Sequence, residues 1–133
     1  MPEKETMRRA QKDKREGKAP STQAGEFVKE EMDHIREGKH GARSTRQAIA
    51  IGLSKARRAG VDLPPPKKGT ASKRTRTQAA RDRAKGQTSP GKKPSSKRSR
   101  AVSSALKREG RSAASHASLS RHAKTASRRR QAK

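Results

Sequence analysis

The sequence predicts a mostly α-helical protein, with an antiparallel helical hairpin in its N-terminal half and a largely disordered basic tail that forms transient helices. Three observations lead to this prediction. Two segments between residues 21 and 63 carry apolar residues three and four positions apart, as amphipathic helices do. The 133 residues include only four Leu, three Ile, three Val and one Phe, too few to build a core along the whole chain. The net charge of +25 is concentrated after residue 63.

Residues 1–20 are predicted to form a polar helix followed by a linker. Oppositely charged side chains recur three and four positions apart over residues 3–16, which supports a solvated helix. Met7 and Ala10 are the only apolar side chains of that segment. We therefore expect this helix to have no face to bury, and we expect Gly17 and Pro20 to separate it from the next one.

Residues 21–63 are predicted to form the hairpin, and its first arm is an acidic helix over about residues 23–37. Ser21 or Thr22 is suited to cap its start, and Gly38 to end it. Acidic residues outnumber basic ones in this arm five to two. Its apolar stripe includes Phe27 and Ile35, eight positions apart and therefore on one face.

The second arm is predicted to be a basic helix that runs from Ser44 to about Ala59. Ser44 and Gln47 have capping-box spacing, in which the hydroxyl accepts the N–H three residues on and the amide side chain returns to the backbone. Gly60 can adopt the left-handed conformation that ends many helices. The three prolines that begin at Pro64 prevent any continuation.

The link of residues 38–43 is short, which favours an antiparallel pairing of the two arms, and their opposite charges agree with it. So few large side chains do not offset the conformational entropy lost on ordering the module. We therefore expect a homodimer through the hairpin, or another partner, to complete the fold. The predicted hairpin core consists of Phe27, Val28, Met32, Ile35, Ile49, Leu53, Ala56 and Val61.

Residues 64–133 are predicted to form a basic, low-complexity tail. They hold 22 Lys and Arg against two acids, whereas residues 1–63 hold 15 against ten. Two 15-residue repeats occur in the tail, at residues 72–86 and 96–110, and each begins with Ser-Lys-Arg and ends on Gly. Spacers rich in Pro, Gly and Ser surround them. We expect these segments to be mostly unformed until phosphates neutralise their arginines.

This density of cations predicts nucleic-acid binding through phosphate. Phe27 is the only aromatic residue, so the base stacking used by single-strand binders is not available, and duplex is favoured. DNA is the expected partner ahead of RNA. The predicted phosphate-contacting residues are Arg46, Lys55, Arg57, Arg58, Lys67, Lys68, Lys73, Arg74, Arg76, Arg81, Arg83, Lys97, Arg98, Arg100, Lys107, Arg108, Arg128, Arg129 and Arg130.

The basic arm of the hairpin has two interpretations. It can enter a major groove like the second helix of a helix-turn-helix, or it can be a hairpin arm whose charges face solvent. The apolar face formed by Ile49 and Leu53 must be buried, which favours the hairpin arm.

Other classes of function have little support in the sequence. The chain lacks a phosphate-cradling glycine loop and has too few apolar residues to build a pocket, so we expect no enzymatic activity, cofactor or small-molecule substrate. Cysteine is absent, and the pairs His34/His40 and His116/His122 lack metal-ligand spacing, so no metal site is expected. A membrane role is disfavoured because the basic helix has few large aliphatic side chains to insert.

One stretch resembles a known family. The run EGKHGARSTRQAIAIGLSKARRAG, with STQAGEFVKEEMDHI before it and VDLPPPKK after it, is similar to an uncharacterised bacterial family of short basic proteins with a domain of unknown function. The resemblance covers about residues 3–68. It implies a bacterial cytoplasm and no established activity or site. Some relatives are labelled plasmid stabilisation proteins, which implies a DNA-associated role.

Two hypotheses about function follow. The first is a non-enzymatic, sequence-tolerant nucleic-acid-binding protein, most plausibly a DNA-associated nucleoid or plasmid-maintenance factor. The second is a protein-interaction module, whose hairpin docks on a toxin or a ribosomal surface while the tail gives only non-specific retention on RNA. Division of the chain at Pro64 separates them, because only the first hypothesis places the main binding activity in residues 67–133.

Overall fold

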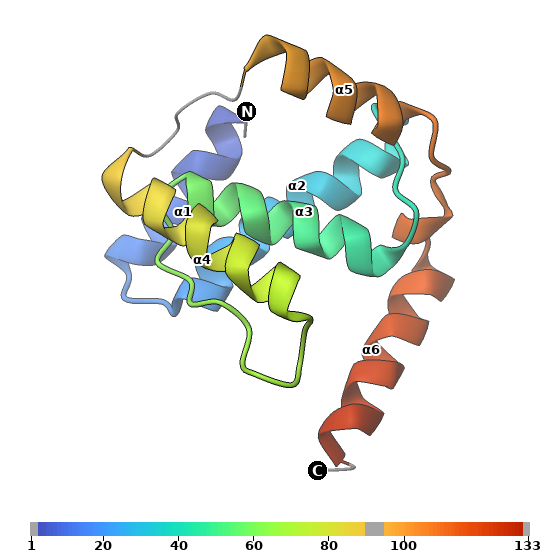
Figure 1. Ribbon diagram of the computed structural model, residues 1–133. Coiled ribbons are helices and arrows are strands. Elements are labelled where there is room, and N and C mark those ends of the chain that lie inside the picture. The colour runs from blue at the N-terminus through green and yellow to red at the C-terminus, as the bar shows by residue number, and fades with distance from the viewer. Residues whose placement is uncertain (1–2, 90–94, 132–133) are drawn as a thin grey trace. The chain divides into compact units, whose positions relative to one another are not determined.

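The computed structural model describes residues 3–89 and 95–131, and this part of the chain is mostly helical, as the sequence predicts (Figure 1). It contains no strand; Lys68 and Ala71 form only an isolated bridge. The spacer between the two repeats lies partly outside the described residues. The helices are α1 (Lys4–Arg15), α2 (Pro20–Arg36), α3 (Thr45–Arg58), α4 (Lys73–Thr88), α5 (Ser96–Lys107), the short 3-10 helix η1 (Ser112–Ala114) and α6 (His116–Gln131).

The chain divides into two compact units, each made from two separate stretches of sequence. The first unit contains Met1–Glu30 and Ile51–Lys93. The second contains Glu31–Ala50 and Pro94–Lys133. Each unit therefore combines part of the predicted hairpin with part of the basic tail.

The core of the first unit lies where α1, α2 and α3 meet. Ala10, Ala24, Phe27, Ala56 and Val61 form its buried cluster, and Phe27 is fully buried. Half-buried side chains, including Met7 and Leu53, pack around this cluster. Since its members come from both arms of the hairpin, the predicted packing of α2 on α3 is present in this unit.

A glycine sets the separation of α2 and α3. A Cβ atom at Gly52 would lie 2.7 Å from the Cα of Val28 and 3.0 Å from its backbone nitrogen. Those distances are shorter than real Cβ contacts, so a larger residue at Gly52 would push the helices apart. The predicted core residues differ in burial: Phe27, Met32, Ile35, Ala56 and Val61 are buried, whereas Val28, Ile49 and Leu53 are half-buried.

The expectation that α1 has no buried face is wrong. Ala10 is buried in the core cluster, with Met7 packed against it. The buried Thr6 hydroxyl donates a hydrogen bond of 3.2 Å to the Oε1 of Glu30. Polar side chains thus help to dock α1 on α2, because apolar side chains are scarce in α1. A search for hydrophobic patterns cannot reveal such contacts.

Both ends of α3 follow from local sequence. At its start, the Ser44 hydroxyl accepts a hydrogen bond of 3.1 Å from the N–H of Gln47, as predicted. The Gln47 side chain accepts from the N–H of Arg43 rather than from that of Ser44. At its end, Gly60 has a φ of 112°, and the N–H of Val61 donates to the carbonyl of the residue five positions earlier. This is the predicted Schellman cap.

The basic tail was predicted to be largely disordered, and the described part of it is instead helical. In the first unit, α4 packs on α3 through small and polar residues (Figure 1). Ala79, Asp82 and Gly86 are its buried residues. A Cβ at Gly86 would overlap the carbonyl oxygen of Arg57, so only glycine allows the observed approach.

In the second unit, the link between α2 and α3 pairs with the last turn of α5 and the residues that follow it. The N–H of Gly41 donates to the carbonyl of Leu106 at 2.8 Å, and the N–H of Ala42 donates to that of Gly110 at 3.0 Å. A Cβ at Gly41 would overlap the carbonyl oxygen of Glu109. Backbone groups, rather than apolar side chains, hold these two segments together.

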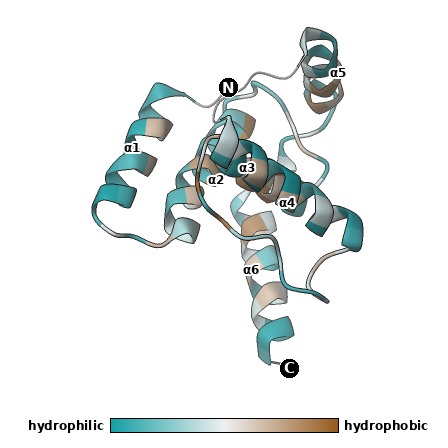
Figure 2. Ribbon diagram, turned by 60° about the vertical axis from the view of Figure 1, so that its left-hand side comes forward, coloured by the Kyte–Doolittle hydropathy of each residue, from teal (hydrophilic) through white to brown (hydrophobic). Residues whose placement is uncertain are grey.

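The residues before α6 are held by hydrogen bonds from side chains to their backbone carbonyls. Ala113 and Ala114 of η1 are buried. The carbonyl of Ala114 accepts a hydrogen bond of 3.0 Å from the Nε of Arg36, and the carbonyl of Ala113 accepts one from the Thr45 hydroxyl. In contrast, α5 and α6 have no buried residues of their own, and the C-terminal end of α6 is hydrophilic (Figure 2).

Candidate nucleic-acid interface

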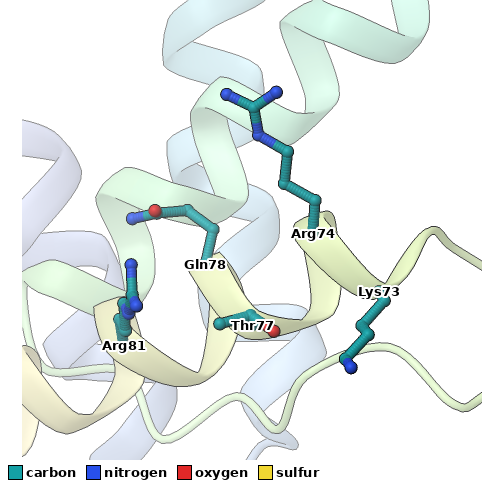
Figure 3. Close-up of a pocket in the computed structure, with 5 residues that line it drawn as sticks. All are labelled: Lys73, Arg74, Thr77, Gln78 and Arg81. Atoms are coloured by element: carbon teal, nitrogen blue, oxygen red, sulfur yellow. The ribbon is translucent and has the colours of Figure 1, made fainter.

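The exposed face of α4 gathers cations around an open hollow in the first unit. Lys73, Arg74, Thr77, Gln78 and Arg81 line it (Figure 3). Lys73, Thr77 and Arg81 follow one another at intervals of four positions, and Arg74 and Gln78 form a second such row beside them, so the five residues lie along one side of the helix. All five are exposed. This face of α4 therefore carries three positive charges, a hydroxyl and an amide, and the Lys73 side chain points away from that of Arg74 (Figure 3).

The docking of α4 determines which face it exposes. Buried Asp82 accepts a hydrogen bond of 2.5 Å from the Ser54 hydroxyl of α3. Its other oxygen accepts from the Gln78 amide at 3.2 Å, and the Nε of Arg58 lies 3.8 Å from that oxygen. Asp82 is one of the two acids of the tail, and its charge is used in these contacts on the buried side.

The N-terminus of α4 adds to the positive potential of this face. Ser72 caps the helix, and its hydroxyl accepts the N–H of Thr75 at 3.1 Å. The first turn contains Lys73, Arg74 and Arg76 and no acid. Cations at this end are disfavoured by the helix dipole, so a bound anion would stabilise the arrangement.

Arg57 does not belong to this surface, although the sequence suggested it. Its side chain is buried, and its guanidinium donates to the carbonyls of Leu63 at 3.2 Å and Pro64 at 3.0 Å. Burial lowers the pKa of Arg57 below its ordinary value. The guanidinium therefore holds the turn after α3, and phosphate cannot reach it without displacing those carbonyls.

Three other predicted residues make contacts within the first unit. Arg58 returns to the Ser54 carbonyl of its own helix at 3.4 Å. Arg83 forms an ion pair of 2.7 Å with exposed Asp62. The Nε of Arg76 donates to a proline carbonyl at 3.3 Å. These three side chains are half-buried, so each offers less of its charge to solvent than the cations of the hollow do.

The two repeats form similar helices with different surroundings. Ser95 caps α5, and its hydroxyl accepts the N–H of Arg98 at 3.2 Å. The α5 residue that corresponds to Gln78 is the exposed Val102, and the one that corresponds to Asp82 is Leu106. The second repeat therefore lacks the polar contacts that dock the first one on α3.

The remaining predicted cations are mostly exposed. Lys55 of α3 is half-buried, whereas the cations of α5 and α6 are open to solvent. Thr77 and Gln78 were not predicted as site residues. The sequence could have predicted them if this segment had been treated as a formed helix, because they follow Lys73 and Arg74 by four positions and so share their face. The other exposed predicted residues are Arg46, Lys67, Lys68, Lys97, Arg98, Arg100, Lys107, Arg108, Arg128, Arg129 and Arg130.

The structure also brings together three potential metal ligands that do not belong to α4. One ligand atom each of Glu31, His34 and His40 lies within 4.8 Å of the others. The sequence spacing of the histidines had suggested no such group.

The resemblance seen in the sequence is confirmed by comparison with protein families. Residues 4–68 match the family of unknown function DUF6496. The DUF6496 segment includes α1, α2, α3 and the prolines after them, and it ends before α4 begins. The candidate interface on α4 therefore lies outside the matched region.

Comparisons with curated proteins and with solved structures found no match. Among the helices that the structure describes, none is both long and apolar enough to cross a membrane.

Proposed function

We propose that this protein is a non-enzymatic, sequence-tolerant nucleic-acid-binding protein that acts on duplex DNA, as a nucleoid or plasmid-maintenance factor does. The observation that carries the proposal is the docking of α4. Its small and acidic residues face α3, while Lys73, Arg74 and Arg81 share one exposed face. Asp82, the one acid of this helix, is buried on the other side.

The geometry of this face suits an anion such as phosphate. Two of its cations, Lys73 and Arg74, lie in the first turn of the helix, where the dipole and free N–H groups also favour anions, and Arg81 follows two turns later. The Thr77 hydroxyl and the N–H of Gln78 that does not bond Asp82 can donate to phosphate oxygens, and such contacts position a protein on DNA without reading bases. Release of counterions from the DNA supplies the driving force.

The second unit supports the same proposal with cations of its own. Those of α5 and the Arg128–Arg130 run of α6 are exposed, and neither helix buries a side chain against its own unit. Solvent-exposed helices of this charge can bind phosphate without first breaking protein contacts. The single phenylalanine, Phe27, is buried, so no aromatic side chain is available to stack on bases.

The test compares two triple variants of the full-length protein that remove the same charge. The interface variant carries Lys73→Gln, Arg74→Gln and Arg81→Gln. The control variant carries Lys4→Gln, Lys14→Gln and Arg15→Gln, three exposed cations of α1. Affinity for a labelled DNA duplex is measured by fluorescence anisotropy over a series of salt concentrations.

The interface variant should bind more weakly, and the slope of log K against log salt should become shallower by roughly two to three, since each phosphate contact contributes about 0.9. The control variant should keep the wild-type slope. If both variants lose affinity equally, binding depends on net charge and the assignment of α4 fails. Tighter binding to duplex RNA than to DNA would overturn the choice of DNA.

A further inference from the structure

Three side chains that can bind metals meet in the second unit. Glu31 and His34 lie one turn apart on α2, and His40 comes from the link that follows the helix. Glu31 is fully buried, and both histidines are half-buried. A carboxylate removed from water in this way requires a positively charged partner. The group is therefore built into the structure and is not an exposed acidic cluster.

The hydrogen bonding of His40 directs one ring nitrogen toward Glu31. Its Nδ1 lies 2.9 Å from the carbonyl oxygen of Gly41. A carbonyl can only accept, so Nδ1 carries a hydrogen and donates it. The other nitrogen, Nε2, lies 3.1 Å from the Oε2 of Glu31. A backbone carbonyl that orients a metal-binding histidine in this manner is a common feature of metal sites.

We propose that Glu31, His34 and His40 bind a divalent transition-metal ion, with Zn²⁺ as the preferred metal. Two histidines and one glutamate form one of the ligand sets that protein zinc sites use, with water in the fourth position. Tetrahedral bonds of about 2.0–2.2 Å place two ligands of one zinc ion roughly 3.3–3.6 Å apart. The His40 and Glu31 atoms are 3.1 Å apart, so they need to separate only slightly to share an ion.

The position of His34 completes the set. Its ring centroid lies 6.1 Å from that of His40, and the rings are inclined by 82°, so they do not stack on each other. One nitrogen of His34 joins the other two ligand atoms within 4.8 Å.

Metal binding would connect the end of α2 to the link that leads into α3. His40 lies beside Gly41, whose N–H is already bonded to the carbonyl of Leu106. An ion held by Glu31, His34 and His40 would therefore fix the link on which these backbone contacts depend. Because the ion binds the folded protein, it should raise the melting temperature.

The experiment uses full-length protein freed of nucleic acid and metal. Zn²⁺ is titrated in competition with a chromophoric chelator, and one tight equivalent per chain is expected. His34→Gln and His40→Gln should each weaken this equivalent at least about tenfold, which is the smaller loss seen when even an outer contact of a metal site is removed. The control is the double variant His116→Gln/His122→Gln in α6, which should bind Zn²⁺ like the wild type.

A second measurement uses the wild-type protein and therefore does not require any variant to fold. In nuclear magnetic resonance spectra of the wild-type protein, Zn²⁺ should shift the imidazole signals of His34 and His40 and leave those of His116 and His122 in place. Three outcomes would overturn the proposal: no tight equivalent, an equivalent lost in the α6 control, or shifts confined to the α6 histidines. Each of these outcomes would mean that His40 and Glu31 form a direct ion pair and bind no metal ion.

Discussion

Replacement of Gly86 by alanine tests the docking of α4 on α3. The added Cβ would overlap the Arg57 carbonyl oxygen, and it would lie 2.9 Å from the carbon of that carbonyl and 3.2 Å from the nitrogen of Gly60. All of these atoms belong to the backbone at the end of α3, so no side-chain rotation can make room. The helix must move away, and the hydrogen bond between Asp82 and Ser54 must lengthen or break.

Two opposing effects determine the magnitude. Overpacking of a well-packed site costs about 1–3 kcal/mol, and a fixed backbone contact belongs to the upper part of that range. Alanine is favoured over glycine inside a helix by about 0.5–1 kcal/mol. The net expectation for Gly86→Ala is a loss of about 1–2 kcal/mol in the free energy of unfolding.

The matched control is Gly25→Ala in α2. Gly25 is exposed and helical, and a Cβ there would meet nothing within 4 Å. This variant should gain about 0.5–1 kcal/mol from helix propensity alone. Both variants are unfolded in urea and followed by circular dichroism, with hydrogen exchange of the α4 amides as a local readout. If Gly86→Ala is stabilised as much as Gly25→Ala, the close approach of α4 to α3 is refuted.

Two further substitutions test other contacts. Gly41→Ala should accelerate hydrogen exchange in the link before α3, because its Cβ would overlap a backbone carbonyl, whereas a Cβ at Gly110 has open space and Gly110→Ala should leave that exchange slow. Arg57→Lys should lower the melting temperature, because lysine cannot reproduce the guanidinium contacts to the Leu63 and Pro64 carbonyls, yet it should leave the salt dependence of DNA binding unchanged. A slope that falls with Arg57→Lys would show that this side chain contacts phosphate.

Local sequence predicted that the first 63 residues contain three helices, but it placed the start of α2 wrongly, because the helix begins at Pro20 and not after Ser21 or Thr22. The spacing of Phe27 and Leu53 within their helices placed both in the core region, and both pack there. Ser44 predicted the start of α3, and Gly60 with Val61 predicted its end. These predictions succeeded because caps and amphipathic stripes depend on residues within a few positions of one another.

The tail could not be predicted in the same way. Its contacts are of three kinds. Gly86 and Gly41 each lie against a backbone carbonyl, Asp82 is buried and hydrogen-bonded, and small alanines such as Ala113 are buried. None of these contacts produces a hydrophobic pattern in the sequence. A close backbone contact, or a hydrogen bond to a buried polar group, depends on which residue lies opposite in the folded chain. Composition therefore indicated disorder where the structure has helices, of which α4 is docked through buried residues.

The sequence by itself determined that this chain is helical, strongly cationic and capped at defined positions, because charge and capping are properties of neighbouring residues. Only the tertiary structure decided which cations face solvent. It turned Arg57 inward to the Leu63 carbonyl and left Lys73 and Arg81 on an open face. It also brought His40 within 3.1 Å of Glu31, nine positions away, because the link after α2 folds back on the end of that helix. No periodicity encodes such a return of the chain.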